Sequence, residues 1–318
     1  MSKIILSGVK PTGRPHIGNY FGAMKQFVDL QNKLASGDHN FIMIADYHGL
    51  NFIHDQATMR ENTLNLAIDY LAIGIDPVKS TIFKQSDVSA HTELGWIFNT
   101  ITTMPYLMRA HAFKDAEAKN KEISVGAFDY PMLMAADILL YNTDIVPVGQ
   151  DQKQHVEYAR DTALKFNHIF KTETFKLPDV LTIEGVAVVP GTDGQKMSKS
   201  YGNTIGLFAT REEITKAVMG IVTDSGSDVP KNVYAMHRLL KSEAELAPLY
   251  EANKGKYKAL KDALVEDIDA FIKPMRERRE ELARDIDKVH AVLAEGAIKA
   301  RAQADMKLAE VKKVIGVL

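Results

Sequence analysis

Short apolar runs alternate with longer, helix-periodic stretches in the first half of the chain. The short runs occupy residues 4–6, 41–44, 81–83 and 145–148. Their length and their β-branched and aromatic content predict buried strands. Between them, apolar residues recur with helical spacing, for example over residues 59–73 and 94–104. Such alternation is typical of an α/β fold with a parallel sheet.

The pattern changes in the second half. Residues 186–189 form one more strand-like run, and after about Thr204 the strand signal fades. Helical patterns follow over residues 243–250, 257–282 and 286–314. Pro274 lies inside one of them and predicts a break or a kink. Residues 109–127 are polar and charged, which indicates an insertion between elements of the sheet. We therefore expect an α/β part followed by a helical part.

Three polar segments come directly after predicted strands. They are the turn around His16, the segment 46–48 (Asp-Tyr-His) and the segment 149–151 (Gly-Gln-Asp). Parallel sheets bind ligands beyond the carboxyl ends of their strands. We therefore expect all three segments to meet at one edge of the sheet, where a ligand would bind.

The composition narrows the class of protein. The chain has 318 residues, of which 46% are hydrophobic and 25% charged, and its formal net charge is −2. It has no cysteine, which excludes disulfides and cysteine-ligated metal centres. We see no apolar run of transmembrane length and no signal peptide. These features are those of a globular protein, which we expect in the cytoplasm.

The first motif covers residues 11–19 and reads Pro-Thr-Gly-Arg-Pro-His-Ile-Gly-Asn. It joins a predicted strand to a predicted helix. Gly13 and Gly18 allow close approach of the backbone, and His16 and Asn19 can donate hydrogen bonds to phosphate oxygens. The start of a helix also carries unpaired N–H groups and partial positive charge, which suit a phosphate. A simple strand-to-helix turn with a surface histidine is the alternative explanation.

The second motif covers residues 196–200 and reads Lys-Met-Ser-Lys-Ser. Lys196 and Lys199 are point charges on long side chains, which suits them to a leaving pyrophosphate. Taken alone, the motif could equally be a solvated polar loop. Together with the first motif, it predicts that two cationic segments distant in sequence close on one polyphosphate.

Asp137 stands in an otherwise apolar stretch. Leu133, Met134, Leu140 and Tyr141 share its helical face at spacings of three and four residues. A buried carboxylate without a partner is costly, so Asp137 should face a hydrogen-bond donor. That donor is a ligand, or else Asp137 is a core residue that caps a helix or pairs with a basic side chain.

These motifs resemble those of the class I aminoacyl-tRNA synthetases and, within that class, the tryptophanyl-tRNA synthetases. Residues 11–19 resemble the first signature of the class, with Asn19 where many relatives carry a second histidine. Residues 196–200 match the second signature. Residues 134–149, continuing through 151–155, closely resemble the tryptophan enzymes. The resemblance spans nearly the whole chain and is weakest in the C-terminal helices.

The resemblance implies a Rossmann-like catalytic domain over residues 1–203, with an insertion near 105–130, and a helical anticodon-binding domain over 204–318. It implies that L-tryptophan is activated with ATP to tryptophanyl-adenylate and pyrophosphate, and is then transferred to the 3′ end of tRNA(Trp). Mg²⁺ would accompany the ATP phosphates without a dedicated protein metal site. A homodimer is also implied.

The resemblance further implies roles for individual residues. The catalytic residues would be His16, Asn19, Lys196 and Lys199. The ATP site would comprise Lys10, Pro11, Thr12, Gly18, Asn19, Gly149, Gln150, Asp151, Val188, Lys196, Met197, Ser198, Lys199 and Ser200. The tryptophan site would comprise Leu6, His48, Tyr130, Met134, Asp137, Val146, Val148 and Gln152. Within it, Asp137 would accept a hydrogen bond from the indole N–H, which can only donate.

Two basic segments are less clearly assigned. Bacterial relatives often carry two lysines spaced by one residue in the insertion. Here Lys114 is present but Ala116 takes the second place, so Lys119 or Lys121 would have to supply the charge. The three arginines at positions 276, 278 and 279 would hold the anticodon stem and loop, or form a solvated helix face paired with the glutamates at 277 and 280.

Three other functions remain open from the sequence. A tyrosyl-tRNA synthetase shares the fold and both signatures, and a phenol can also donate to Asp137. A small-molecule adenylyl- or nucleotidyltransferase uses a similar histidine turn but is usually shorter. A non-catalytic, synthetase-like paralogue would bind RNA or tryptophan as a regulator.

Overall fold

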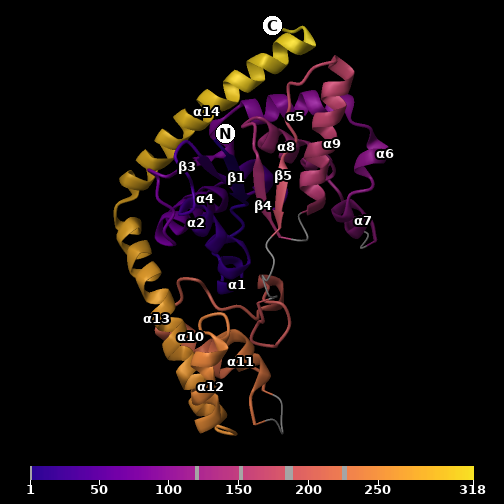
Figure 1. Ribbon diagram of the computed structural model, residues 1–318. Coiled ribbons are helices and arrows are strands. Elements are labelled where there is room, and N and C mark those ends of the chain that lie inside the picture. Colours follow the sequence, from indigo (N-terminus) through magenta and orange to yellow (C-terminus); the bar gives the residue numbers. More distant parts are fainter. Residues whose placement is uncertain (1, 119–121, 150–152, 183–188, 224–227) are drawn as a thin grey trace.

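In the described part of the chain, five parallel strands form the centre of the protein (Figure 1), for which we describe a computed structural model. The structure describes residues 2–118, 122–149, 153–182, 189–223 and 228–318. The strands are β1 (Ile4–Val9), β2 (His39–Ile44), β3 (Ser80–Lys84), β4 (Ile145–Val148) and β5 (Asp179–Thr182). Their order in the sheet is β3-β2-β1-β4-β5, and every neighbouring pair is parallel. The α/β class expected from the sequence is confirmed.

The order in which strands are added to the sheet reverses at β1, although all the strands stay parallel. From β1 the chain first builds outward through β2 to β3, and then returns to the other side of β1 to add β4 and β5. Strand β1 pairs with β4 where Ile5 lies opposite Ile145, near the start of both strands. Open α/β sheets bind ligands at such a switch point, beyond the strands' carboxyl ends. The topology therefore places a crevice between β1 and β4.

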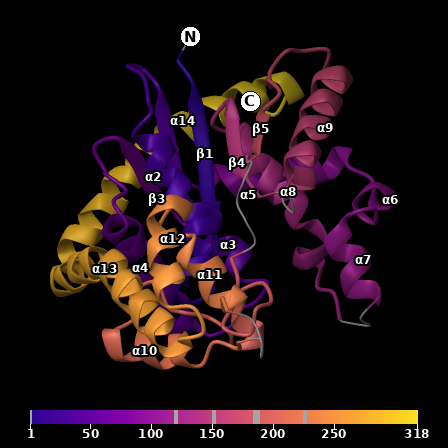
Figure 2. The same cartoon turned by 60° about the horizontal axis from the view of Figure 1, so that its bottom comes forward.

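Helices cover both faces of the sheet (Figure 2). The first half contains α1 (Ile17–Asn19), the π-helical turn η1 (Tyr20–Met24), α2 (Lys25–Gln31), α3 (Asp46–Gly49), α4 (Gln56–Ala72), the 3₁₀ turn η2 (Gln85–Asp87), α5 (Ala90–Ile101), α6 (Met104–Leu107), α7 (His111–Ala118), α8 (Val125–Leu139) and α9 (Lys153–Phe170). The second half contains the 3₁₀ turn η4 (Lys199–Tyr201), α10 (Arg211–Met219), α11 (Lys231–His237), α12 (Glu243–Ala252), α13 (Tyr257–Arg284) and α14 (Ile286–Ile315). Within the described residues, no helix is long and apolar enough to cross a membrane.

Two hydrophobic clusters lie on opposite faces of the sheet. In β2, Ile42 and Ile44 belong to one cluster, whereas Phe41 and Met43 belong to the other. Successive strand residues point to opposite faces, so a continuous apolar run is what a sheet covered on both sides requires. The first cluster includes α2, α4 and α13, and the second includes α5, α8 and α9.

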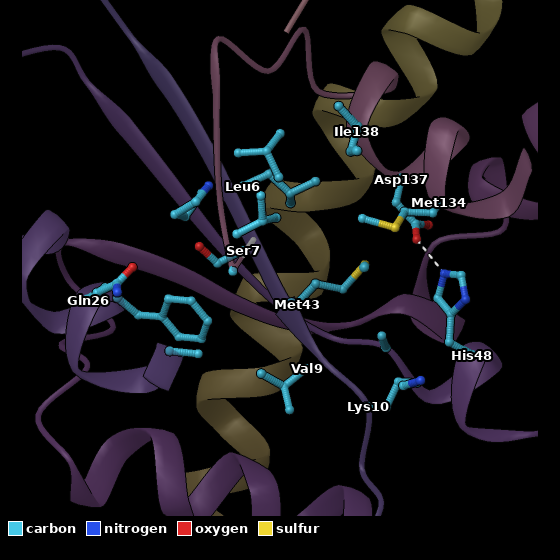
Figure 3. A pocket seen from close by; sticks show the side chains of 18 of the residues that line it. Leu6, Ser7, Val9, Lys10, Gln26, Met43, His48, Met134, Asp137 and Ile138 are labelled. Atoms are coloured by element: carbon cyan, nitrogen blue, oxygen red, sulfur yellow. Dashed lines mark hydrogen bonds and ion pairs between the residues drawn. The ribbon is translucent and has the colours of Figure 1, made fainter. Parts of the chain in front are cut away.

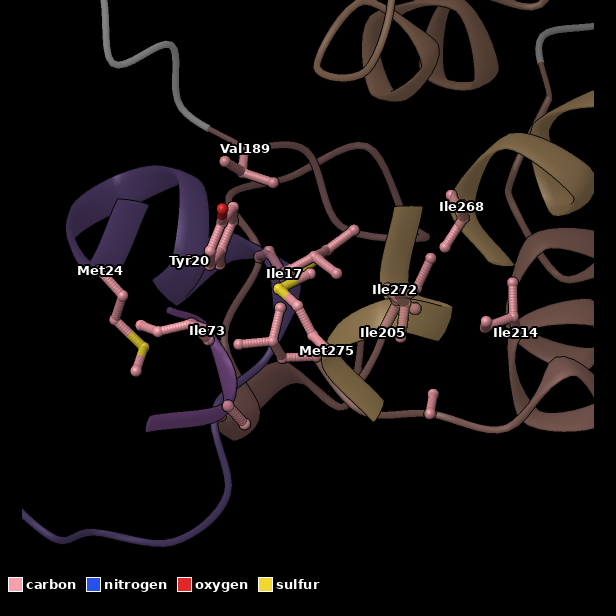
Figure 4. Packing of buried hydrophobic residues seen from close by; sticks show 14 of the residues in the cluster. Ile17, Tyr20, Met24, Ile73, Val189, Ile205, Ile214, Ile268, Ile272 and Met275 are labelled. Carbon is pink, nitrogen blue, oxygen red and sulfur yellow. The ribbon is translucent and has the colours of Figure 1, made fainter. Parts of the chain in front are cut away.

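The first cluster joins distant parts of the chain (Figure 4). Ile17 and Tyr20, which follow the His16 turn, share this cluster with Ile205 and with Ile272 and Met275 of α13. All five side chains are buried. The turn that carries the first motif is therefore held by the same core that anchors the long C-terminal helices.

The C-terminal helices extend along one edge of the molecule (Figure 1). Helix α13 continues without interruption through Pro274, so the break expected there does not occur. The neighbouring buried residues Ile272 and Met275 pack into the core on both sides of the proline and hold the helix in place. Helix α14 then crosses β3. At Gly296 a Cβ atom would lie 1.8 Å from the carbonyl oxygen of Ile82, so this approach is open only to glycine.

Some sequence-based boundaries were wrong. The helix expected over 94–104 is two helices, because Thr102 and Thr103 are extended between α5 and α6. Strand β5 was not predicted, and in the run expected as a strand over 186–189, residues 186–188 lie outside the described residues. Val189 lies outside the named strands and accepts a hydrogen bond from the Met197 N–H.

The arginines of α13 bind protein groups. Arg279 is buried and donates from Nε to Asp69 Oδ1 of α4 at 2.6 Å. Arg276 donates to the Ala209 carbonyl and to Asp269. For these two arginines, the expected pairing with the glutamates at 277 and 280 was wrong, because the side chains bind a carbonyl and aspartates within the fold.

Candidate active site

A cavity of about 320 Å³ lies between the carboxyl halves of β1 and β4 (Figure 3). Its position is the switch point of the sheet. Seven of the eight residues expected to bind tryptophan line it, namely Leu6, His48, Tyr130, Met134, Asp137, Val146 and Val148. Lys10 and Gly149, expected near the nucleotide, line it as well. The eighth residue, Gln152, lies outside the described residues. Side chains from β1, α3, α8 and β4 thus converge on one cavity.

Local structure explains this convergence. Tyr130, Met134 and Asp137 are spaced by four and three residues on α8, so they share one face of that helix. His48 lies on the short helix α3, which begins two residues after β2 ends. Because β2 is parallel to β1, its carboxyl end meets the same edge of the sheet. The cavity is therefore bounded by a strand edge on one side and by α8 on the other.

Asp137 is 2% exposed and has three side-chain donors among the described residues. His48 Nε2 lies 2.8 Å from Oδ2, His91 Nδ1 lies 2.6 Å from Oδ1, and Gln85 Nε2 donates to Oδ1 at 2.8 Å. Burial alone would raise the pKa of Asp137, but the hydrogen bonds from His48 and His91 outweigh it and hold the pKa far below its usual range. The cavity therefore contains a carboxylate that is ionised at neutral pH.

His91 and Gln85 were missed in the sequence. His91 sits in an apolar helical pattern, where a histidine is usually a core residue. Gln85 follows β3 directly, just as the segment of His48 follows β2. The carboxyl-edge argument that singled out His48 would also have found Gln85.

The hydroxyl of Tyr130 lies 2.5 Å from His155 Nε2. The Tyr130 ring meets the His48 ring edge to face, with 6.3 Å between their centroids. Burial raises the pKa of Tyr130, so its hydroxyl keeps its proton at neutral pH. Tyr130 thus connects the cavity to α9 through His155 and to α3 through His48.

The His16 turn is closed by reciprocal hydrogen bonds. The Asn19 N–H donates to His16 Nδ1 at 3.2 Å, and the His16 N–H donates to Asn19 Oδ1 at 3.1 Å. Burial, with a contribution from the charge of Lys199, lowers the pKa of His16 to about 4. The ring is therefore neutral at pH 7. Because Nδ1 accepts, the ring proton is on Nε2, which remains a donor.

The lysine loop is held by Asn203. Its Oδ1 accepts from the Ser198 N–H at 2.8 Å, and its Nδ2 donates to Asp193 Oδ1 at 2.7 Å and to the Lys196 carbonyl at 3.2 Å. Asn203 is 2% exposed. Asn203 was not predicted from the sequence, although an asparagine just after a glycine-containing turn often fixes a loop through side-chain hydrogen bonds. The loop between residues 193 and 203 therefore has a defined shape.

The two motifs lie against each other. Lys199 Nζ donates to the Thr12 carbonyl at 3.2 Å, and a Cβ placed on Gly18 would lie 3.2 Å from Met197 Cβ. The Ile17 N–H donates to the Ile205 carbonyl at 2.9 Å. The predicted meeting of two segments distant in sequence is present in the structure. Lys196 and Ser200 are exposed on the same loop, and the Ser200 and Ser198 hydroxyls are 2.9 Å apart.

Several predicted positions lie outside the described residues. These are Gln150, Asp151, Gln152, Val188, Lys119 and Lys121, and the side chain of Ala116 is also outside them. Within the described residues, no group of three or more histidine, aspartate or glutamate side chains is arranged to hold a metal ion.

Comparison with known proteins identifies the family. The family model described as "tRNA synthetases class I (W and Y)" matches residues 2–291. A tryptophan–tRNA ligase from Fusobacterium nucleatum is 48% identical over 321 aligned residues, which cover 98% of each chain. The chain belongs to the tryptophanyl-tRNA synthetases of class I. The crystal structure of a tryptophanyl-tRNA synthetase from Campylobacter jejuni, complexed with ADP and tryptophan, superposes with a TM-score of 0.91 at 43% identity, covering 98% of this chain and 99% of that one.

A tyrosyl-tRNA synthetase from Archaeoglobus fulgidus, complexed with L-tyrosine, is more distant. It is 20% identical, with a TM-score of 0.67, and covers 87% of this chain and 90% of its own. That likeness concerns the fold alone. Membership of the tryptophanyl-tRNA synthetases accounts for both signature motifs.

Proposed function

We propose that this chain activates L-tryptophan with ATP and transfers the tryptophanyl group to the 3′ end of tRNA(Trp). One observation carries the proposal: an ionised, buried Asp137 faces a cavity at the switch point of the sheet. The relatives that match nearly the whole chain are tryptophan–tRNA ligases, which supports the same reaction.

The cavity suits an indole. Leu6, Met134, Val146 and Val148 provide apolar walls, and Asp137 provides one buried acceptor. An indole offers a large apolar surface and a single N–H that can only donate. We assign the indole N–H to Asp137 and the substrate's amino group to Tyr130 and Gln152.

ATP would lie beyond the open end of the cavity, against the two motifs. We assign the ribose and adenine to Gly149, Gln150, Asp151 and Val188, and the course of the nucleotide to Lys10, Pro11, Thr12, Gly18 and Met197. The α-phosphate would meet His16 Nε2–H, with Asn19 fixing the ring through their reciprocal hydrogen bonds. The β- and γ-phosphates would meet Lys196, Lys199, Ser198 and Ser200. Mg²⁺ would be held by the phosphates and would neutralise part of their charge.

The chemistry needs no general base, because the substrate carboxylate is already a nucleophile. A carboxylate oxygen forms a bond to the α-phosphorus, and the bond from that phosphorus to the bridging oxygen breaks in line with it. Pyrophosphate leaves with the bonding electrons. What this chain supplies is position and positive charge: His16 on the α-phosphate, and Lys196 and Lys199 on the leaving group. The aminoacyl group then passes from AMP to the 2′-hydroxyl of the terminal ribose.

We assign residues 1–203, with an insertion near 105–130, to amino-acid activation and residues 204–318 to the anticodon of tRNA. The described strands all end before residue 204, and the helices α10 to α14 follow it. We further propose a homodimer. Trp96, Met104 and Val125 expose 71%, 67% and 80% of their surface around α5, α6 and the start of α8, which supports an interface there. We place the enzyme in the cytoplasm, where tRNA is charged.

ATP–pyrophosphate exchange tests the function directly. The wild-type protein should support exchange with tryptophan and not with tyrosine or phenylalanine, each offered separately. A protein that exchanges with tyrosine, or with none of the three, would refute the proposal. Asp137→Asn and Asp137→Ala should lose selection of tryptophan while still binding ATP, which equilibrium dialysis can measure.

A further inference from the structure

The hydrogen bonds of Asp137 are unequally shared between its two oxygens. Each carboxylate oxygen can accept about two hydrogen bonds. Among the described residues, Oδ1 accepts from both Gln85 and His91, whereas Oδ2 accepts from His48. Within the part of the chain that the structure describes, Oδ1 is therefore fully used and Oδ2 retains one acceptor position. A ligand in the cavity would have to bind that remaining position.

The two donors to Oδ1 are buried side chains outside the cavity lining. His91 and Gln85 are both 0% exposed, and neither is among the described residues that line the cavity. The His91 ring stacks on Phe83 at 6.1 Å between centroids and 24° between planes. Its Nε2 lies 2.9 Å from the Tyr141 hydroxyl. The imidazole is therefore held on its face and at both nitrogens, with Nδ1 directed at Asp137.

Tyr141 completes this arrangement. It is fully buried, and burial together with the charge of Asp137 raises its pKa well above the usual range, so its hydroxyl keeps its proton. Nδ1 of His91 must donate, because a carboxylate only accepts. A phenol beside Nε2 fixes the other edge of the ring. The chain Tyr141–His91–Asp137 is thus ordered before any ligand enters.

We propose that His91, supported by Gln85, is a positioning residue that fixes Oδ1 of Asp137 and so presents the free acceptor position of Oδ2 to the substrate's N–H. This inference rests on the proposed function, since the donor it concerns is the indole of tryptophan. His91 acts through Asp137 and does not touch the substrate. Its effect is selectivity for a ring that carries N–H over a ring of the same shape that does not.

The effect of His91 depends on the orientation of the Asp137 carboxylate. A carboxylate that loses its donors on one side can turn about its side-chain torsion, and a hydrogen bond weakens steeply once its angle departs from linear. Apolar contacts between the indole and Leu6 or Val146 do not depend on that torsion. Loss of His91 should therefore weaken recognition of the N–H and leave shape recognition in place.

The test compares two ligands on a matched set of variants. The ligands are L-tryptophan and β-(3-benzothienyl)-L-alanine, in which sulfur replaces the N–H. His91→Leu removes the donor, whereas His91→Asn keeps it, because the amide nitrogen of asparagine takes the place of Nδ1. Calorimetry measures the ratio of the two dissociation constants for each protein.

For His91→Leu, we expect tryptophan to bind about 10- to 100-fold more weakly, the range of one hydrogen bond to a charged group. The affinity of the benzothienyl analogue should change by less than about threefold, which is less than the effect of one buried methylene group. His91→Asn should recover most of the wild-type ratio. Equal weakening of both ligands, an unchanged ratio, or an asparagine variant that behaves like the leucine variant would each overturn the inference.

Gln85→Met provides an independent variant of similar shape. It removes the second donor to Oδ1 and should shift the same ratio in the same direction. If His91→Leu fails to fold, an unchanged ratio for Gln85→Met overturns the inference. The proposed function fails separately: it fails if the wild-type protein does not bind tryptophan more tightly than the analogue and does not activate it.

Discussion

His16 combines two tasks that one pair of substitutions can separate. Its Nδ1 accepts from the Asn19 N–H and caps the helix that follows, while Nε2–H remains to donate to a phosphate. Asparagine is among the best N-capping residues, so His16→Asn should keep the cap. It removes the ring and with it the reach of the Nε2–H donor. His16→Ala removes both.

The two losses have different sizes. Losing the cap costs about 0.5–2 kcal/mol of stability. Losing one donor to developing phosphate charge costs about 2.7–4 kcal/mol of activation free energy, which is roughly 10²–10³ in rate. We therefore expect both variants to be slowed by about 10²–10³ in adenylate formation. His16→Ala should in addition unfold more easily, and His16→Asn should not.

The pKa of about 4 adds a further prediction for pH. At pH 7 roughly one His16 ring in 10³ is protonated, so the donor is the neutral imidazole. Adenylate formation should therefore show no inflection from His16 between pH 5.5 and 8. The unfolded chain takes up this proton near pH 6.5 and the folded protein near pH 4. His16 should thus lower the stability as the pH falls through that window.

The assays are pyrophosphate exchange across pH for the rate, and urea unfolding at pH 7 and pH 5 for the stability. At pH 7, wild type and His16→Asn should differ strongly in the rate of pyrophosphate exchange and little in the free energy of unfolding. An asparagine variant with wild-type exchange would refute the donor role. An inflection near pH 6.5 that disappears in both variants would refute the neutral imidazole.

Three further predictions test other parts of the structure. Gly296→Ala should lower the free energy of unfolding by about 1–3 kcal/mol, because the new Cβ would collide with the Ile82 carbonyl. This loss is expected even though alanine normally favours a helix. A variant that is more stable than wild type in urea unfolding would contradict the packing of α14 on β3. Lys199→Ala should slow single-turnover adenylate formation far more than it weakens tryptophan binding, and equal effects would argue against a role in the transition state. Arg279→Met should cost about 3–5 kcal/mol, because it strands Asp69 in the core, and Asp69→Asn in the same chain should restore most of that loss, as chemical denaturation can show.

The sequence predicted those parts of the fold that have a regular pattern. The runs at 41–44 and 145–148 are strands because their apolar side chains serve both faces of a covered sheet. Strand β5 escaped notice because Asp179 and Thr182 leave it a short, partly polar edge strand. The break that Pro274 allowed does not occur, because Ile272 and Met275 on either side of it pack into the core and keep the helix continuous.

The residues of the candidate site also differ in how far the sequence could predict them. Asp137 and His48 were predictable because one stands out in an apolar helix and the other follows a strand. His91 and Asn203 were not, since their roles come from contacts with residues far away in space or from the shape of a loop. Tertiary contacts of this kind leave no periodic signal in the sequence. Membership of a family transfers ligand-binding residues by motif, but not the residues that hold them.

The cost of burying Asp137 explains the selectivity expected of this site. Apolar walls such as Leu6 and Val146 distinguish ligands that differ by one small group by only about 10- to 200-fold. A site with a buried acceptor can reject a ligand without the matching donor by about 10⁴–10⁵, because one acceptor position of the buried carboxylate is then left unfilled. Phenylalanine has no such donor, and a tyrosine hydroxyl would have to reach the same oxygen from a smaller ring. The three fixed donors around Asp137 keep that acceptor charged and aimed, so selection depends on where the ligand carries its proton as well as on its shape.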